Sequence, residues 1–311
     1  MNLLHLKYAV EVAKTSSITK AADNLYMGQP NLSRAIRELE DSLGIQIFKR
    51  TPKGIYPTPK GEEFLGYARK ILEQVDSVER LYRGEKDDEH KFAVSVPRAS
   101  YISSAFNGFI KKLNNAPLFE ISYKETNSMR TINNVLNADY NLGILRYRSS
   151  YDRYFKEMLE NKGLESELIC EFNCVLLISK DSPLASQNII HEDDLKSYSE
   201  IAYPDPYVPT LPISTVQKEE LSAGVEKHIF VFERATLMEL LSSVPETFIW
   251  TSPVPSDMLE RYGLVERVCT GAERKYRDVL IRRKDYMFTD TDKLFIDELT
   301  KAKRKFSDMS K

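Results

Sequence analysis

Residues 17–43 read Ser17-Ile-Thr-Lys-Ala-Ala-Asp-Asn-Leu-Tyr-Met-Gly-Gln-Pro-Asn-Leu-Ser-Arg-Ala-Ile-Arg-Glu-Leu-Glu-Asp-Ser-Leu43, and they decide the N-terminal fold. The pattern predicts a short helix, a tight turn and a second helix. Ser17 is placed to cap the first helix, because its hydroxyl can accept a free amide of the opening turn. We expect the corner at 26–28, where Gly28 would tolerate the backbone angles of a sharp turn. Pro30 marks the start of the second helix, where its missing N–H costs nothing.

The second helix has two unlike faces. Leu32, Ile36, Leu39 and Leu43 recur at helical spacing, which predicts a face packed on the core. The opposite face is short, polar and positive, and it suits the floor of a DNA major groove. The expected DNA-binding residues are Ser17 and Lys20 on the first helix and Gln29, Pro30, Asn31, Ser33, Arg34 and Arg37 on the second. The same pattern would also fit a helical hairpin with a solvated polar face.

The flanking residues favour the DNA-binding interpretation. Residues 45–48 alternate like a strand, 49–54 form a basic turn and 55–57 return as a second strand. Arg50 and Lys53, near the tip of this wing, would contact phosphate or the adjacent minor groove. A new helix is expected to begin at Thr58-Pro59, and a packing helix is expected upstream from Leu3, Leu6, Val10 and Ala13. Together these elements predict a winged helix-turn-helix.

The N-terminal 65 residues closely resemble the LysR-type transcriptional regulators. The residues that carry the resemblance are Ala21-Ala22, Leu25, Gln29-Pro30, Leu32-Ser33, Ile36, Leu39-Glu40, Leu43-Gly44, Phe48, Arg50, Thr58-Pro59 and Gly61. The loop at 180–185 is similar to one that most members carry further along the chain. Two positions depart from the family pattern. Gly28 replaces the usual serine or threonine, and Asn31 replaces a small apolar residue, which puts the start of the recognition helix and the target sequence in question.

The helix after Thr58 carries an apolar stripe at steps of four and three residues. Its members, which we expect to mediate dimerisation, are Phe64, Ala68, Ile71, Val75, Val78 and Tyr82. Such a heptad stripe is typical of a helix packed along a partner helix. It would also fit a helix packed on its own domain. A solvated, charged hinge follows at 83–90, and the resemblance likewise implies a dimer, which would read an inverted repeat with half-sites about one helical turn apart.

Composition agrees with a DNA-binding head on an acidic body. The 311 residues suggest about two domains. The net charge of −2 divides into +4 for residues 1–72 and −6 for the remainder. The sequence contains no apolar run long enough to span a membrane and no export signal, so we expect a cytoplasmic protein. Cys170 and Cys174 lie in a strand-like run about 13 Å apart, which favours buried thiols over a disulfide or shared metal.

From residue 91 onward, predicted strands alternate with predicted helices. This alternation favours parallel sheets with helices on both faces. The resemblance implies an α/β effector-binding domain of two lobes similar to periplasmic binding proteins, with chain crossings near 165–170 and 264–270. The expected organisation is a winged helix-turn-helix domain at 1–58, a linker and dimerisation helix at 59–90, and the effector domain at 91–311. Within the last, lobe I would comprise 91–165 and 268–311, and lobe II 166–267.

One stretch departs from the family pattern. Residues 149–161 predict an added amphipathic helix, where most relatives have a shorter loop. It would patch the core from the surface, or alternatively form a lid or an oligomer contact.

A ligand is expected between the lobes, at the carboxyl ends of the strands. That rule and the resemblance select, as effector-binding residues, Arg98, Ser100, Tyr101, Thr126, Asn127, Ser128, Arg146, Tyr203, Glu233, Arg234 and Thr236. Ser100 and Ser128 would donate from helix N-termini. Arg98 and Arg146 indicate an anionic effector held by charge-assisted pairing, although structural ion pairs are the alternative.

An enzyme built on the α/β region is the main rival interpretation. The sequence contains no phosphate-binding glycine loop and no nucleophile elbow, and its four histidines lack metal-ligand spacing, so we expect no enzyme activity, cofactor or metal. A second rival is a ligand-binding module whose head contacts protein. The sequence therefore predicts a dimeric or tetrameric, sequence-specific DNA-binding regulator of transcription. The resemblance implies control by a small-molecule effector and contact with RNA polymerase.

Overall fold

The computed structural model describes residues 2–51, 54–83, 89–114, 118–137, 140–271 and 274–309. The chain divides into two compact units. The first contains the residues up to Asp88, and the second contains those from Glu89 onward, apart from 136–138. No helix in these described ranges is long and apolar enough to cross a membrane.

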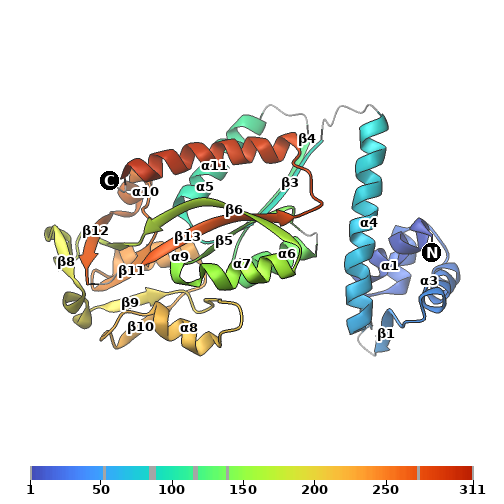
Figure 1. The fold of residues 1–311 in the computed structure, drawn as a ribbon, viewed down its shortest axis with the longest axis horizontal. Helices are drawn as coiled ribbons and strands as arrows, with labels where there is room; N and C mark the ends of the chain where they lie inside the picture. Colours follow the sequence, from blue (N-terminus) through green and yellow to red (C-terminus); the bar gives the residue numbers. More distant parts are fainter. Residues whose placement is uncertain are drawn as a thin grey trace. The chain divides into compact units, whose positions relative to one another are not determined.

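The N-terminal unit is a winged helix-turn-helix followed by a long helix (Figure 1). Its elements are α1 (Leu3–Thr15), α2 (Ile18–Asn24), α3 (Gln29–Leu43), β1 (Phe48–Thr51), β2 (Gly54–Pro57) and α4 (Pro59–Arg83). Apolar residues from each of these elements form one core, with Leu32, Leu39, Ile47 and Leu65 completely buried. The predicted fold of this region is confirmed, because the apolar stripe of α3 faces that core.

Two predicted helix caps are present. Ser17 Oγ accepts the Lys20 amide at 3.3 Å, and Thr58 Oγ1 accepts the Gly61 amide at 2.9 Å. The predicted role of Gly28 in the corner is wrong. Gly28 has an ordinary φ of −70°, whereas the left-handed residue is Tyr26, with φ of 50°. The turn places its tight angle two residues earlier because α2 ends at Asn24.

The wing begins later than predicted. Residues 45–47 form a loop rather than a strand, because the Glu40 carboxylate accepts the amides of Ile47 at 2.7 Å and Phe48 at 3.0 Å. The basic residues Lys49 and Arg50 therefore lie in β1, not in the turn, and Arg50 is paired with Ile55 of β2. Lys53 and the Arg50 side chain lie outside the described residues.

The second unit contains two sheets, each with its own helices (Figure 1). We define lobe I by the five-stranded sheet, in the order β4-β3-β5-β13-β6, and lobe II by the six-stranded sheet, in the order β10-β9-β11-β7-β12-β8. The strands of lobe I are β3 (Glu89–Val96), β4 (Leu118–Glu125), β5 (Leu142–Arg148), β6 (Leu164–Asn173) and β13 (Lys275–Arg283). The strands of lobe II are β7 (Val175–Ser179), β8 (Ile189–His191), β9 (Ser199–Ala202), β10 (Lys227–Phe230), β11 (Thr247–Thr251) and β12 (Leu264–Thr270).

Helices cover both sheets. In lobe I, α5 (Ser100–Leu113) and α11 (Asp290–Met309) pack on one face, while α6 (Ser128–Leu136) and α7 (Asp152–Asn161) lie on the other (Figure 1). The helices of lobe II are α8 (Ile213–Glu220), α9 (Arg234–Ser243) and α10 (Ser256–Tyr262), and short 3₁₀ segments at Pro183–Ser186 and Glu192–Ser197 precede them in the chain. Separate apolar clusters fill the two faces of the lobe II sheet.

The sheets are mixed rather than parallel, which corrects the prediction. β13 runs antiparallel to β5 and β6, and β7 runs antiparallel to β11 and β12. These antiparallel pairs arise because β6 and β7 follow one another with only Cys174 between them, so the chain leaves one sheet and enters the other without a helical crossover.

The crossings between lobes also lie later than predicted. Pairing of β6 with β13 places residues 164–173 in lobe I, so the first crossing is at Cys174 rather than near 165–170. The second falls between β12 and β13, after Thr270, rather than near 264–270. Because the strand ends at Asn173, Cys170 and Cys174 do not share one strand. Both thiols are free, but only Cys170 is buried as expected, whereas Cys174 is half-buried.

The predicted added helix is present as a 3₁₀ turn at Ser149–Tyr151 followed by α7. Phe155 and Leu159 are buried, and the Phe155 ring stacks on Tyr147 with centroids 4.0 Å apart. Tyr154 is exposed. The helix therefore patches the surface of lobe I, which was the first of the two interpretations.

Candidate functional site

The outer face of α3 is the first candidate site. Gln29, Asn31, Arg34 and Arg37 are exposed, as predicted for residues that face DNA. A surface groove runs along this helix and is lined by Gln29, Pro30, Ser33, Arg34, Arg37, Glu38 and Asp41. Its polar and basic lining offers hydrogen-bond donors to bases and phosphates.

Ser33 is the exception on this helix, because it is buried with 6% of its surface exposed. It sits between the apolar stripe and the groove, so its small side chain turns toward the core while its edge still lines the groove. Ser17 is half-buried, and its hydroxyl accepts a hydrogen bond as the N-cap of α2. Lys20 of the same helix is exposed.

The apolar stripe of α4 has a mixed environment. Ala68 is fully buried and Phe64 packs against the core of the N-terminal unit, so the start of the stripe serves its own domain. Ile71 and Val75 are half-buried, and Val78 is 55% exposed. The side chain of Tyr82 lies outside the described residues.

The second candidate site is a cavity of about 190 Å³ lined by residues of both lobes, which we call the cleft. Six predicted effector-binding residues line it: Arg98, Thr126, Asn127, Ser128, Arg146 and Tyr203. The described lining does not include Ser100, Tyr101, Glu233, Arg234 or Thr236. The first two are buried at the start of α5, and Glu233 and Thr236 are exposed.

Two of these five side chains have structural partners instead. The Tyr101 hydroxyl donates to Asp278 Oδ2 at 2.6 Å inside lobe I. Arg234 of lobe II reaches across to lobe I, where it pairs with Glu125 at 3.0 Å and donates to Ser103 Oγ at 3.1 Å. Arg234 thus connects the lobes outside the cleft.

Arg146 is held by a buried carboxylate. Its Nε and Nη2 donate to the two Asp278 oxygens at 2.8 and 2.7 Å, and Nη1 donates to Ser252 Oγ of lobe II at 3.2 Å. Burial alone would lower the pKa of Arg146, but the Asp278 charge outweighs it and raises that pKa, so the guanidinium stays ionised. Asp278 is fully buried, so this pair is part of the structure of lobe I.

Arg98 is also paired. Its Nη1 lies 3.1 Å from Asp205 Oδ1 of lobe II, and its guanidinium sits 4.5 Å from the centre of the Tyr203 ring. Asn127 donates to the same aspartate, at 3.0 Å to its backbone oxygen and 3.2 Å to Oδ2. Both arginines expected to bind an anion therefore already have carboxylate partners.

Ser128 differs from its predicted role as a donor to the ligand. Its hydroxyl donates to the Arg146 carbonyl at 3.0 Å, which ties α6 to β5. Its side chain is buried at the cleft wall.

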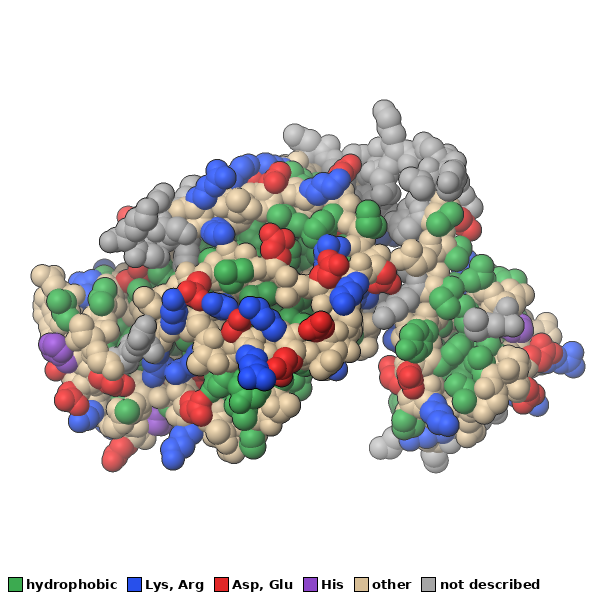
Figure 2. Space-filling model, in the orientation of Figure 1, with side chains coloured by type: hydrophobic (Ala, Val, Ile, Leu, Met, Phe, Trp, Pro, Cys, Tyr) green, Lys and Arg blue, Asp and Glu red, His purple; other side chains and the backbone are tan. Residues whose placement is uncertain are grey.

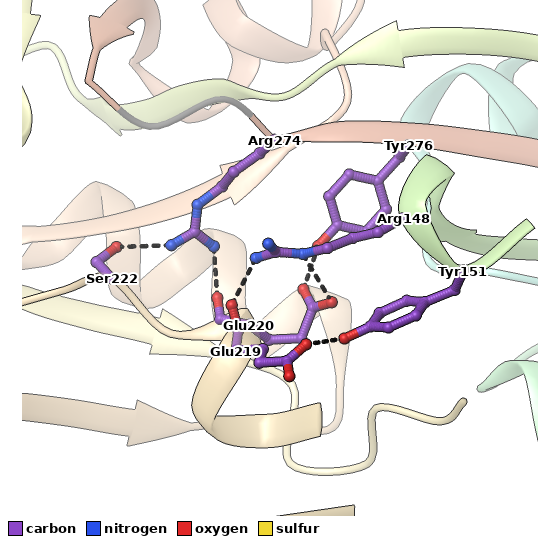
Figure 3. Close-up of polar contacts among 7 residues, drawn as sticks. All are labelled: Arg148, Tyr151, Glu219, Glu220, Ser222, Arg274 and Tyr276. Carbon is purple, nitrogen blue, oxygen red and sulfur yellow. Dashed lines mark hydrogen bonds and ion pairs between the residues drawn. The ribbon is translucent and has the colours of Figure 1, made fainter. Parts of the chain in front are cut away.

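A polar cluster that the sequence analysis missed forms the other end of the cleft (Figure 3). It joins lobe I, through Arg148, Tyr151 and Tyr276, to lobe II and the second crossing, through Glu219, Glu220, Ser222 and Arg274. Arg148 lies two positions after the predicted Arg146, whereas Glu219 and Glu220 lie at the C-terminal end of α8, far from the end of the preceding strand β9. The rule of strand carboxyl ends could not select them.

Charges outside the cleft are mixed. On the face shown in Figure 2, Lys and Arg side chains of the second unit are interspersed with Asp and Glu. Among the ion pairs outside the cleft, Arg277 pairs with Asp152 at 2.8 Å and with Glu171 at 2.7 Å. No group of His, Cys, Asp and Glu in the described residues could hold a metal ion.

Comparison with known proteins agrees with this architecture. Residues 3–62 match the family model of the bacterial regulatory helix-turn-helix proteins of the lysR family. The transcriptional regulator AlsR of Bacillus subtilis is 28% identical over 268 residues, covering 85% of this chain and 83% of AlsR.

Two solved structures share the fold. A full-length variant of OxyR from Pseudomonas aeruginosa superposes with a TM-score of 0.69 at 17% identity, covering 96% of this chain and 98% of that one. Full-length CbnR in complex with its target DNA superposes with a TM-score of 0.57 at 19% identity, covering 97% of this chain and 100% of that one. The winged helix-turn-helix, the long helix and the two α/β lobes of this chain thus have the fold of these two full-length structures. Through residues 3–62, the N-terminal domain of the chain belongs to the lysR family of bacterial regulatory helix-turn-helix proteins.

Proposed function

We propose that this protein binds an inverted-repeat promoter sequence as a dimer or tetramer and is controlled by a small molecule in the cleft. Residues 1–58 would read the DNA, 59–90 would link and dimerise, and 91–311 would bind the effector. The protein would act in the cytoplasm, where it would also contact RNA polymerase. The single observation that carries the proposal is the exposed polar and basic face of α3 on a helix-turn-helix core.

The head supports direct base reading. Arg34 is exposed at the centre of the α3 groove, between Gln29 and Arg37. A bidentate arginine to guanine contact in the major groove contributes about 1–3 kcal/mol of discrimination. Asn31 beside it offers both a donor and an acceptor, the pattern that recognises adenine. The relative whose structure contains target DNA shares this fold.

The cleft supports control by an effector. It lies between two lobes that are joined by side-chain contacts rather than by a common core, such as Arg98 with Asp205 and Arg234 with Glu125. A ligand that contacts both lobes would change the balance of these contacts. Such a change would alter the geometry of a dimer on DNA.

The test is fluorescence anisotropy of the purified protein on DNA from upstream of its own gene, across a salt series. We expect tight, salt-sensitive binding that exceeds binding to scrambled DNA, because phosphate contacts release counterions. Arg34→Ala should weaken binding by about 1–3 kcal/mol and relax specificity at one base pair.

The matched control is Arg153→Ala, which removes the same charge from an exposed position on α7. It should leave DNA binding unchanged. Equal loss in both variants would show a general charge effect and contradict base reading by Arg34. Equal loss on every DNA sequence would show that Arg34 contacts phosphate alone. If no genomic DNA fragment bound better than scrambled DNA, the proposed function itself would be wrong.

A further inference from the structure

The polar cluster of Figure 3 consists of two consecutive carboxylates surrounded by donors. Glu219 and Glu220 end α8 of lobe II, and both side chains point toward residues of lobe I. Tyr151 donates to Glu219, and Tyr276 donates to Glu220. Arg148 Nε pairs with Glu220 Oε1 at 3.1 Å, and its Nη2 donates to the Glu219 carbonyl at 2.7 Å.

A second guanidinium completes the cluster. Arg274 donates to the Glu220 carbonyl and, at 3.1 Å, to Ser222 Oγ. The indole of Trp250 donates to the same hydroxyl at 2.8 Å, and Arg274 lies 4.6 Å from the centre of the indole ring. Arg148, Glu220, Trp250, Arg274 and Tyr276 all line the cleft, so a molecule in the cavity reaches this cluster.

The donors form a set that recognises carboxylates. Two guanidinium groups and two phenolic hydroxyls converge on the end of α8, and guanidinium to carboxylate hydrogen bonds are among the strongest in proteins. Burial raises the pKa of Tyr276 well above its usual value, and the nearby Glu220 charge adds to the effect, so the phenol remains a donor at neutral pH.

The carboxylates that these donors bind are side chains of the protein itself. The other two cleft arginines, Arg98 and Arg146, are paired with Asp205 and Asp278. Asp278, the partner of Arg146, is fully buried. A ligand that displaced it from Arg146 would therefore leave the aspartate charge buried without a partner in lobe I. Glu220 and Arg148 keep 25% and 20% of their side-chain surface exposed, so their pair can open to water.

We propose that the effector is a small carboxylate that replaces the Glu220 side chain on Arg148 and Tyr276, so that the end of α8 is a built-in competitor for the ligand. This inference rests on the proposed function and names the effector class for the cleft. Exchange of one carboxylate for another keeps the donors satisfied. It also removes the contacts of the Glu220 side chain between α8 and lobe I, which couples binding to the relative position of the lobes.

The experiment uses the single tryptophan of the chain as its reporter. Because the Trp250 indole is hydrogen-bonded to Ser222 inside the cluster, its fluorescence emission should change when the cluster rearranges. Succinate and its neutral analogue succinamide are titrated into the full-length protein and into Glu220→Gln. We expect succinate to change the emission and succinamide not to. Glu220→Gln should bind succinate roughly tenfold more tightly, because a neutral amide competes less well than a carboxylate for the charged donor.

Two further variants make the result specific. Adding Tyr276→Phe to Glu220→Gln should reverse most of the gain, because one donor to the ligand is removed. Asp205→Asn removes the same charge from the cleft lining beside Arg98 and should give a smaller gain. An equal gain in Asp205→Asn would show that net charge alone sets affinity, which overturns the exchange.

Glu226→Gln, at an exposed position of lobe II, serves as the control for folding and should match the wild type in thermal unfolding and in succinate affinity. Equal succinate affinity in the wild type and Glu220→Gln would overturn the proposal, as would the absence of any succinate response in both. Sequence-selective DNA binding is measured on the same preparations without ligand. A protein that binds its DNA but ignores succinate contradicts this inference alone, whereas loss of selective DNA binding contradicts the proposed function.

Discussion

Gly28 and Gly61 occupy opposite environments in the N-terminal unit. A Cβ built on Gly28 would have Asn31 Nδ2 at 3.7 Å and Pro30 Cδ at 3.8 Å as its nearest neighbours, which is ordinary contact. Gly28 is the N-cap residue of α3 and has no side chain to satisfy the first amides. A Cβ on Gly61 would lie 2.0 Å from the Ile47 carbonyl oxygen.

We therefore expect Gly28→Ser to stabilise the protein by a few tenths of a kcal/mol, since serine caps a helix slightly better than glycine does. Urea unfolding of the two proteins, followed by circular dichroism, measures the difference. Gly61→Ser is the matched control and should destabilise by about 1–3 kcal/mol, because the backbone must move to admit the side chain. A lower urea midpoint for Gly28→Ser would contradict the open environment at this position.

Local sequence was a good guide to single residues where the cause is local. The caps at Ser17 and Thr58 depend on amides three residues away, and both were predicted. Tyr101 was misplaced because its partner, Asp278, is 177 positions further along the chain. Ser33 lines the α3 groove but is more buried than the predicted outer face implies, because helical spacing assigns a residue to a face only within about one position.

At the scale of elements, the two strands that flank the crossings, β6 and β12, have only a weak local pattern. Both mix charged with apolar residues. Their pairing partners come from distant sequence, since β6 pairs with β13 over a separation of about a hundred residues. Neither the antiparallel direction nor the order of the sheet follows from local pattern.

Glu171 of β6 makes the pairing of β6 with β13 sensitive to pH. Its oxygens lie 2.5 Å from Lys275 Nζ and 2.7 Å from Arg277 Nε, both on β13. Hydrogen bonds from these two side chains lower the pKa of Glu171 from 4.5 to about 2. Because the pKa is lower in the folded state, this carboxylate stabilises the protein above about pH 4.5, and the contribution is lost as the pH falls toward 2.

We expect Glu171→Gln to be less stable than the wild type at neutral pH, with the difference shrinking below about pH 4 and gone near pH 2. Urea midpoints of both proteins across this range check the expectation. Since the side chains are partly exposed, the difference at neutral pH should also fall at high salt. A difference that stayed constant from pH 7 to pH 2 would rule out the ion pairs as its source.

At the scale of the whole molecule, the fold class and the family were predictable because the N-terminal 65 residues carry a dense and specific pattern. The position of the cleft between the lobes was predictable, but only part of its lining was. Its six predicted lining residues follow the strands, but the residues that close it come from α8 and the second crossing. Interlobe partners such as Asp205 and Glu220 reside in segments that carry no periodic signal, so only the fold reveals them.

The apolar stripe on α4 is the expected dimer contact, because a regulator that reads an inverted repeat needs two DNA-binding domains. Val78 continues the stripe beyond the part that packs on the core, and it is 55% exposed in the single chain. A carboxylate at an exposed position costs the folded chain little, but in a helix–helix seam it would be desolvated without a partner. Val78→Asp should therefore convert the dimer to monomer in multi-angle light scattering with little change in thermal unfolding of the head.

The same variant should bind a single half-site as the wild type does but lose the gain in affinity that a full inverted repeat provides. Val78→Ile keeps the seam apolar and is the matched control, which should remain dimeric and bind the full repeat normally. If Val78→Asp stayed dimeric at low micromolar concentration, the stripe would not be the dimer interface. Its exposed valine would then be an ordinary surface residue of a helix packed on its own domain, and the two heads would be joined elsewhere in the chain.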